Sequence, residues 1–391
     1  MASLTTSTSL SLTEKLTLIL RLAFLGPPQL LFEVTRCLTL AAIRGAPLRH
    51  YVHSAWNRFA LGRLSARQLQ FLTAPTSTTY QTWIPSRKAQ ALKSPSPVAH
   101  YTASRLQHTV DPLPDGASSL LWVGDCARAT KVVYFLHGGG YAAPLLPGHL
   151  EWCLRAYVLA GAAHPGEEVA VAVLQYTLCP PAQYPSQLKQ AVAGLAHLLK
   201  SGVRPRDLVL GGDSAGGNLT AAVLGHLLHP HPEAVEVVLA EPLAGAFLVS
   251  PWVSAGTKGR SFEENQYIDM LSPAMVGKTT AGFVAGVLSY EVQSREGKLW
   301  AMPVDGDAEA WFAGLDKIVN AVYVTVGGQE ILLDQGVELA EAIRRGNPGV
   351  DVRLELAKNE AHDFILLEGA AQRDGDAMTR MKAWVSTVFW G

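Results

Sequence analysis

The stretch LVLGGDSAG at residues 208–216 decides the fold of this 391-residue chain. Its three leading apolar residues, 208–210, predict a short buried strand, and the apolar pattern at 217–228 predicts a helix soon after it. The glycines between them allow a tight, strained turn that lifts the hydroxyl of Ser214 above the sheet, next to the positive end of the helix. The stretch therefore predicts a serine nucleophile at a strand–turn–helix junction. A phosphate-binding loop or a plain turn is the alternative interpretation.

Short β runs alternate with helical segments on both sides of this junction. Further strands are predicted at 120–123, 132–136, 169–174, 246–249, 322–326 and 352–356. Further helices are predicted at 150–159, 187–199 and 335–345. Such alternation is typical of a mostly parallel sheet that is flanked by helices on both faces. We therefore expect an α/β fold.

The N-terminal part of the chain is helical and very apolar. SLTE at residues 11–14 is a capping box that opens one helix, and a second helix is predicted at 29–43. Arg21 interrupts the apolar run, and GPP at 26–28 ends it well short of the length that spans a bilayer. We therefore expect residues 1–85 to be cap helices packed over the main body, with no transmembrane anchor. A monotopic contact with a membrane surface is the alternative.

Changes in composition predict the remaining domain organisation. Residues 86–118 are rich in Pro, Ser and Ala and lack apolar periodicity, which predicts a linker or surface loops. Residues 119–391 form the predicted α/β domain. Within this domain the β signal lapses at about 256–313, and we expect this insert to be mainly helical and to complete the cap.

Composition and charge exclude several classes of protein. Hydrophobic residues make up 48% of the chain and charged residues 17%, which argues for a large core and against disorder. The formal net charge is -1 and the sequence contains no long basic run, so nucleic acid is not an expected partner. The four cysteines are widely scattered and match neither a disulfide framework nor a zinc motif. We expect a cytoplasmic protein without a metal or cofactor, with peripheral membrane association as the alternative.

A second glycine-rich motif, HGGG at residues 137–140, follows the predicted strand 132–136. Chance produces this motif about 0.01 times in a chain of this composition, so it is more specific than the serine motif. Consecutive glycines let backbone N–H groups turn toward a substrate oxygen and form an oxyanion hole. We assign that role to the N–H groups of Gly138, Gly139 and Ala215. His137, at the strand end, is expected to brace the loop.

With these two motifs the chain resembles the hormone-sensitive lipase-like branch of the α/β-hydrolase fold, the HGGG esterases. Further similarities to family motifs are YTLCP at 176–180 with YP at 184–185 (Y-R-L-A-P), SPW at 250–252 (S-P-W), GGQEILLD at 327–334 (the acid-bearing turn) and HDF at 362–364 (H-x-F). The resemblance spans about residues 119–370 and looks most like fungal members, many of which serve secondary-metabolite pathways. Thr177 and Pro181 replace the family's usual Arg and Glu, which affects a local polar network outside the expected catalytic centre.

The resemblance implies a catalytic triad in the chain order serine, acid, histidine. His362 is the predicted base because it follows the predicted strand 352–356 and completes that order, and a neutral imidazole suits proton transfer. Glu330 is the predicted acid because it lies in the turn after the predicted strand 322–326. Asp334 falls at the start of the next helix, where the helix dipole explains a carboxylate equally well. Asp363 adjoins His362, and neighbouring side chains in an extended segment point to opposite faces.

Together these residues predict a serine carboxyl-ester hydrolase that acts on a small-molecule ester, with Ser214 as nucleophile, His362 as base and Glu330 as acid. Short or medium acyl chains are expected to be preferred over long triglycerides. Acyl transfer, or another non-hydrolytic pathway role on the same scaffold, is the first alternative. A catalytically silent ligand-binding protein is the second. The sequence carries no signal for the identity of the ester or for the oligomeric state.

Overall fold

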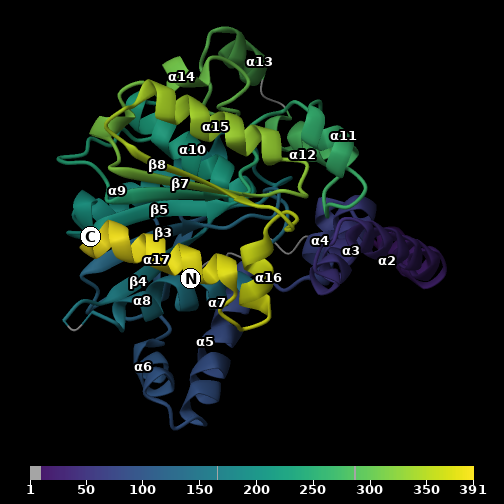
Figure 1. Cartoon of the computed structure of the whole chain (residues 1–391), viewed down its shortest axis with the longest axis horizontal. Coiled ribbons are helices and arrows are strands. Elements are labelled where there is room, and N and C mark those ends of the chain that lie inside the picture. Colours follow the sequence, from purple (N-terminus) through teal and green to yellow (C-terminus); the bar gives the residue numbers. More distant parts are fainter. Residues whose placement is uncertain (1–9, 165, 286–287) are drawn as a thin grey trace.

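The structure is a computed structural model that describes residues 10–164, 166–285 and 288–391 (Figure 1). These residues form one sheet of eight strands in the order β1-β2-β4-β3-β5-β6-β7-β8. The strands are β1 (Val110–Pro112), β2 (Ser119–Val123), β3 (Lys131–Leu136), β4 (Val169–Gln175), β5 (Leu208–Asp213), β6 (Gly245–Val249), β7 (Ala321–Gly327) and β8 (Asp351–Ala357). Strand β2 pairs antiparallel with β1 and β4, and the other neighbouring strands pair parallel. The predicted mostly parallel α/β sheet is therefore confirmed.

Helices cover both faces of the sheet, and each face has its own hydrophobic core. Side chains of β3 alternate between the two, with Tyr134 and Leu136 in one core and Val133 and Phe135 in the other. The first core includes side chains of α9 (Ser186–Lys200), α10 (Ala215–Leu228) and α15 (Leu333–Gly346). The second includes side chains of α7 (Pro147–Trp152), the π-helical turn η2 (Cys153–Val158), α8 (Leu159–Gly161), α16 (Phe364–Ala370) and α17 (Asp376–Trp390). Figure 1 shows α10 and α15 on one side of the sheet and α17 on the other.

Strand β5 runs further than the sequence predicted. It continues to Asp213, so Ser214 follows the strand directly. Gly211 and Gly212 belong to the strand because neighbouring strands leave no room for a side chain. A Cβ on Gly211 would lie 2.3 Å from the ring of Phe247, and one on Gly212 would lie 2.0 Å from a carbonyl oxygen of β3. These two glycines therefore serve close packing within the sheet, and the turn itself begins at Ser214.

The N-terminal helix is continuous where the sequence predicted a break. Helix α1 (Leu12–Leu20) passes through a π-helical turn (Arg21–Leu25) into α2 (Gly26–Ile43). The predicted stop at residues 26–28 was wrong. The two prolines lie in the first turn of α2, directly after the π-helical turn, where a missing N–H costs few helical bonds. By length and composition alone, helix 12–43 is the one helix of the described residues that could cross a membrane.

Most of this helix is exposed, although the sequence predicted cap helices packed over the main body. The predicted capping box is present, and α1 buries only Leu18. Helix α2 packs along α3 (Leu48–Arg63) through Cys37 and Ala41, and it extends away from the sheet (Figure 1). Just 17% of the most apolar 18-residue window is buried. The outer sides of α1 and α2 therefore do not pack on the body of the protein.

The predicted linker at 86–118 contains regular structure. It holds the second half of α5 (Thr76–Leu92), then α6 (Pro97–Arg105) and β1. Ser96 caps α6 by accepting a hydrogen bond from the N–H of Ala99, and a proline occupies the first helical position. The serine and proline of this segment therefore start a helix, and their interpretation as loop residues was wrong.

The insert at 256–313 is helical, as predicted. Its helices are α11 (Arg260–Asn265), α12 (Pro273–Val284), α13 (Leu288–Arg295) and α14 (Ala308–Trp311). Helix α12 lies near α3 and α4 (Ala66–Leu72) at the edge of the sheet where β5 ends (Figure 1). Side chains of these three helices line one cavity with Ser214. The N-terminal helices and the insert thus cover the predicted nucleophile together.

Candidate active site

Ser214 occupies a strained turn between β5 and α10. Its backbone angles are φ 51° and ψ -114°, a conformation that a residue with a side chain rarely adopts. Two hydrogen bonds hold this conformation, because the N–H of Ser214 donates to Val249 O at 2.8 Å and the N–H of Trp252 donates to Ser214 O at 3.1 Å. The side chain faces the cavity instead of a neighbouring strand, as expected of a nucleophile at such a turn.

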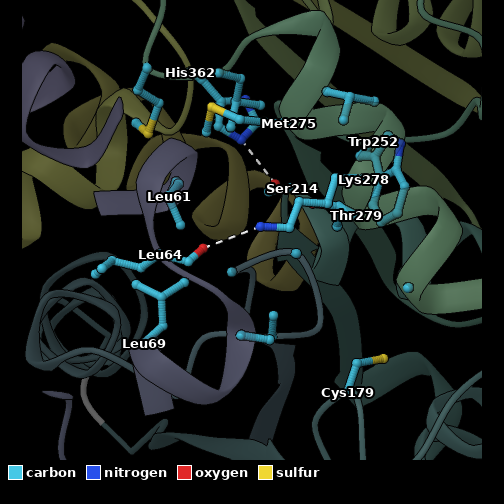
Figure 2. A pocket seen from close by; sticks show the side chains of 18 of the residues that line it. Leu61, Leu64, Leu69, Cys179, Ser214, Trp252, Met275, Lys278, Thr279 and His362 are labelled. Atoms are coloured by element: carbon cyan, nitrogen blue, oxygen red, sulfur yellow. Dashed lines mark hydrogen bonds between the residues drawn. The ribbon is translucent and has the colours of Figure 1, made fainter. Parts of the chain in front are cut away.

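The structure brings Ser214, His362 and Glu330 together. The His362 Nε2 atom lies 2.9 Å from Ser214 Oγ (Figure 2). His362 Nδ1 lies 3.2 Å from Glu330 Oε2. All three residues are buried. If Nδ1 carries the proton and donates it to Glu330, the lone pair of Nε2 is free to accept the serine proton. This arrangement has the geometry of a nucleophile, a base and an orienting acid.

The surroundings of His362 favour its charged form. Burial lowers the pKa of His362, but the carboxyl groups of Asp363, Glu330 and Asp269 raise it, and the net shift is upward. Glu330 Oε1 has no hydrogen-bond partner among the described residues. The imidazolium that forms when serine is deprotonated is therefore stabilised by nearby negative charge.

Asp363 lies closer to His362 than the sequence predicted. Its Oδ2 atom is 3.3 Å from His362 Nε2. The expectation of an extended segment was wrong, because Asp363 has the left-handed conformation with φ 54° and its N–H donates to Ser250 Oγ. Burial raises the pKa of Asp363, and its Oδ1 atom has no hydrogen-bond partner within the described part of the chain. A second buried carboxyl group therefore faces the reacting atoms.

Asp334 has a different role from Glu330. Its Oδ2 atom accepts a hydrogen bond from the N–H of Ser261 at 2.8 Å, and it lies in the first turn of α15. Asp334 thus joins the start of α11 to the start of α15. This position agrees with the interpretation of Asp334 as a helix-terminal carboxylate.

Asp269 is a residue of the site that the sequence analysis missed. Its Oδ2 atom accepts the N–H of Ile331 at 2.9 Å, and its Oδ1 atom accepts the N–H of His362 at 3.2 Å. Asp269 is fully buried, and burial raises its pKa to about 6. One carboxyl group therefore fixes the loop that carries Glu330 to the loop that carries His362. The only signal in the sequence was a single acidic residue between apolar neighbours in the insert.

A buried arginine ties the backbone at Asp269 to the N-terminal helices. Arg58 Nη1 on α3 donates to Asp269 O at 2.8 Å and to Leu271 O at 2.6 Å. Arg58 Nε also lies 3.3 Å from Glu33 Oε2 on α2. Glu33 and Arg58 are both buried. A continuous polar path therefore runs from α2 through α3 to the loops of the triad.

One of the three N–H groups that were predicted to form the oxyanion hole already has an acceptor in the structure. The N–H of Gly138 donates to Asp213 Oδ1 at 3.1 Å, so this donor is already occupied. The assignment of Gly138 to the oxyanion is therefore corrected. The N–H groups of Gly139 and Ala215 donate no hydrogen bond to any described residue. Gly139 has φ 103°, which a residue with a side chain rarely adopts.

Asp213 is itself held by a second histidine. His149 Nε2 lies 3.2 Å from Asp213 Oδ2, and His149 Nδ1 accepts the N–H of Leu146 at 3.1 Å. Since Nδ1 is an acceptor, the proton of a neutral His149 sits on Nε2 and is donated to Asp213. The Asp213 carboxylate thus anchors the glycine loop at Gly138.

His137 has a bracing geometry, as the sequence predicted. Its Nδ1 atom lies 2.8 Å from Gly138 O, and its ring stacks on Tyr176 at 4.4 Å. The hydroxyl of Tyr176 donates to His137 O at 2.8 Å. Burial lowers the pKa of His137 to about 4, so the ring is neutral at pH 7. Where the family usually has Arg, Thr177 bonds through its hydroxyl and its N–H to the side chain of Gln190.

The cavity above Ser214 is mostly apolar and has a volume of about 360 Å³. Figure 2 shows its labelled walls, which come from α3 and α4 (Leu61, Leu64, Leu69), from α12 (Met275, Lys278, Thr279) and from Trp252 and Cys179. Lys278 Nζ donates to Leu64 O at 3.4 Å across the cavity. The cavity therefore suits an apolar group that is attached to a polar, reacting centre.

Sequence comparisons find esterases and related hydrolases. The chain is 27% identical to an esterase of Acinetobacter venetianus over 228 residues, which cover 58% of this chain and 66% of that protein. It is 27% identical to an acetyl-hydrolase of Streptomyces hygroscopicus over 230 residues, which cover 58% of this chain and 67% of that protein. The chain thus spans about two thirds of the length of these relatives.

Structural comparison finds the same fold. A crystal structure of an esterase from the bacterial hormone-sensitive lipase family superposes with a TM-score of 0.57 at 22% identity, over 81% of this chain and 100% of that chain. Residues 132–366, which include Ser214, Glu330 and His362, match the family described as having the alpha/beta hydrolase fold. The chain belongs to this alpha/beta hydrolase family.

Proposed function

We propose that the chain is a carboxylic ester hydrolase with Ser214 as nucleophile, His362 as base and Glu330 as acid. The observation that carries the proposal is the 2.9 Å contact between His362 Nε2 and Ser214 Oγ at a strained strand–helix turn. The names of the relatives, an esterase and an acetyl-hydrolase, support the ester class. A serine activated in this way favours catalysis over ligand binding alone.

In the first half-reaction Ser214 Oγ attacks the ester carbonyl carbon while its proton moves to His362 Nε2. The carbonyl oxygen becomes an oxyanion, and the N–H groups of Gly139 and Ala215 donate to it. Glu330 holds the imidazolium through Nδ1–H. The C–O bond to the alcohol then breaks, the alcohol takes the proton from Nε2, and the acyl group stays on Ser214.

In the second half-reaction water replaces the alcohol. His362 takes a proton from water as the water oxygen attacks the acyl carbon, and it returns a proton to Ser214 Oγ as the acid leaves. If an alcohol or amine attacked in place of water, the same steps would give acyl transfer. Product analysis with water as the only acceptor separates the two outcomes.

The size of the cavity supports a small ester. About 360 Å³ lies at the lower end of the range for drug-sized ligands. We infer a short or medium acyl chain, in a member of the hormone-sensitive lipase-like branch. An ester intermediate of secondary metabolism, as in the fungal proteins that the sequence resembles, fits this size.

The test is covalent labelling with a fluorophosphonate probe. The wild-type protein is expected to gain one probe adduct, located on a peptide that contains Ser214. Ser214→Ala should lose the label and several orders of magnitude in kcat, while its melting temperature stays near that of wild type. The matched control is Ser250→Ala, which removes another buried hydroxyl near the site and should keep the label. Full labelling of Ser214→Ala would refute the proposal.

A further inference from the structure

The outer side of the N-terminal helix is an exposed apolar face. Six large apolar residues, which we call the docking face, are each more than half exposed: Leu12, Leu16, Ile19, Leu20, Phe24 and Leu31. Their spacing follows the helical repeat, so they lie along one side of the helix. Soluble proteins rarely expose an apolar stripe of this length without a partner.

The opposite side of the same helix is attached to the protein. Leu18 packs with Leu64, which lies between α3 and α4, and Cys37 and Ala41 pack against α3. A helix that is held along one side by α3 does not stand free to cross a bilayer. Its free side is available to a flat apolar surface that lies parallel to its axis.

Charge is distributed unevenly along the chain. Residues 1–75 contain eight Lys and Arg residues and two Glu residues, a formal charge of +6, whereas the whole chain carries -1. The remaining residues therefore carry -7. Arg21 lies on the same helix as the docking face and Arg63 directly precedes Leu64, and neither forms an ion pair with any described residue. Basic residues beside an apolar helical face are typical of binding to anionic lipid headgroups.

The same charge argues against a second copy of the chain as the partner. A symmetric dimer through the docking face would bring two regions of formal charge +6 together. Like charges across an interface oppose association. A bilayer with anionic headgroups supplies both the apolar layer and the opposite charge.

The attached side of the N-terminal helix contacts the wall of the cavity. Leu64 packs with Leu18 of α1, and it lines the cavity over Ser214 as well. Leu61 and Leu69 of the same two helices also line the cavity. Leu64 therefore contacts both the attached side of α1 and the cavity, and the docking face lies on the outer side of that same helix.

From these observations we propose that the N-terminal helix docks the protein onto an anionic phospholipid bilayer, with the helix axis in the plane of the membrane and the docking face in the acyl layer. Arg21 and Arg63 bind lipid phosphates. The cavity then lies close to the bilayer, where apolar esters concentrate. The binding step uses none of the triad residues.

The test is flotation of the full chain with vesicles of phosphatidylcholine, with and without phosphatidylserine. Wild-type protein should float with the anionic vesicles. Replacing Leu16, Ile19 and Leu20 together by Ser should lower the vesicle affinity at least ~10-fold, because three exposed apolar side chains no longer enter the acyl layer. The matched control replaces two exposed valines far from this helix, Val235→Ser with Val238→Ser, and should float like wild type.

A second pair of variants tests the charge. Arg21→Gln with Arg63→Gln should lower affinity for the anionic vesicles ~10-fold and abolish their advantage over neutral vesicles. Circular dichroism and probe labelling of Ser214 verify that each variant is folded. If both sets of variants float like wild type, the proposal is wrong. It is also wrong if the wild-type protein floats with no vesicle and the serine variants instead dissociate a dimer.

Discussion

Replacing Asp269 by asparagine tests how the site is held together. The carboxyl group accepts the N–H of Ile331 with one oxygen and the N–H of His362 with the other. The oxygen that faces His362 also accepts the N–H of Met270 at 2.7 Å. An amide has one oxygen, so its NH2 group faces either the N–H of Ile331 or the N–H groups of His362 and Met270. At least one buried N–H then loses its acceptor, which costs about 1–3 kcal/mol of the free energy of unfolding.

The expected change in Tm follows from the length of the chain. At about 2.1 cal/mol/K per residue, unfolding of 391 residues has an entropy near 0.8 kcal/mol/K, so Tm should fall by about 1–4 °C. Activity should fall more steeply, because a shift of ~1 Å in a catalytic group costs ~10²-fold. We expect kcat to fall ~10- to 100-fold and KM to change little, since Asp269 does not line the cavity.

The assay compares wild type and Asp269→Asn on a soluble aryl acetate, with kcat and KM measured across pH and Tm from a thermal scan. The Asp269 carboxyl group raises the pKa of His362, so its removal should move the acid limb of kcat/KM to lower pH. Asp334→Asn, which also replaces a carboxylate that binds a backbone N–H, is the matched control and should stay near wild type. If Asp269→Asn lowers Tm but leaves kcat and the pH profile unchanged, the carboxyl group supports the fold alone and our reasoning is refuted.

Three further predictions concern the site. Glu330→Gln should lose at least ~10²-fold in kcat because the imidazole loses its orienting acid, and a larger loss in Asp334→Asn would move the acid to Asp334. Asp363→Asn removes a carboxyl group 3.3 Å from His362 Nε2, so the pKa of His362 should fall and the acid limb of kcat/KM should shift to lower pH; an unchanged profile would show that Asp363 is uncharged throughout the assay range. Dissolved short-chain esters should be hydrolysed faster than emulsified long-chain triglyceride, and the reverse order in a rate comparison would contradict the cavity argument.

Sequence analysis predicted correctly those elements whose signal lies in consecutive residues. Most strands of the sheet were predicted because their apolar residues are consecutive and are bounded by turn residues. The serine turn was predicted because strand, glycines and helix are adjacent in the chain. Strand β5 was predicted too short because Gly211 was interpreted as a turn residue. A glycine is required at this position because the ring of Phe247, on another strand, leaves no room for a side chain.

The parts that sequence analysis missed depend on contacts between distant segments. Asp269 lies more than sixty residues before Ile331, and nothing near it in the chain points to that contact. The N–H of Asp363, which has the left-handed conformation, donates to Ser250, more than a hundred residues earlier in the chain. The N–H of Gly138 was assigned to substrate because the Asp213 carboxylate that takes it lies on another strand.

Glu33 determines where the protein can be shortened. A truncation that removes residues up to 25 leaves Glu33 and Arg58 paired, so it should give a protein that is easier to handle and keeps its catalytic loops in place. A truncation that removes α2 entirely leaves the buried guanidinium of Arg58 without its carboxylate. Breaking a buried ion pair in this way costs about 3–5 kcal/mol of the free energy of unfolding. Arg58 also donates hydrogen bonds to the backbone on either side of Met270. The longer truncation is therefore expected to lower both the stability and the turnover of the enzyme, although none of the described residues that it deletes lines the cavity.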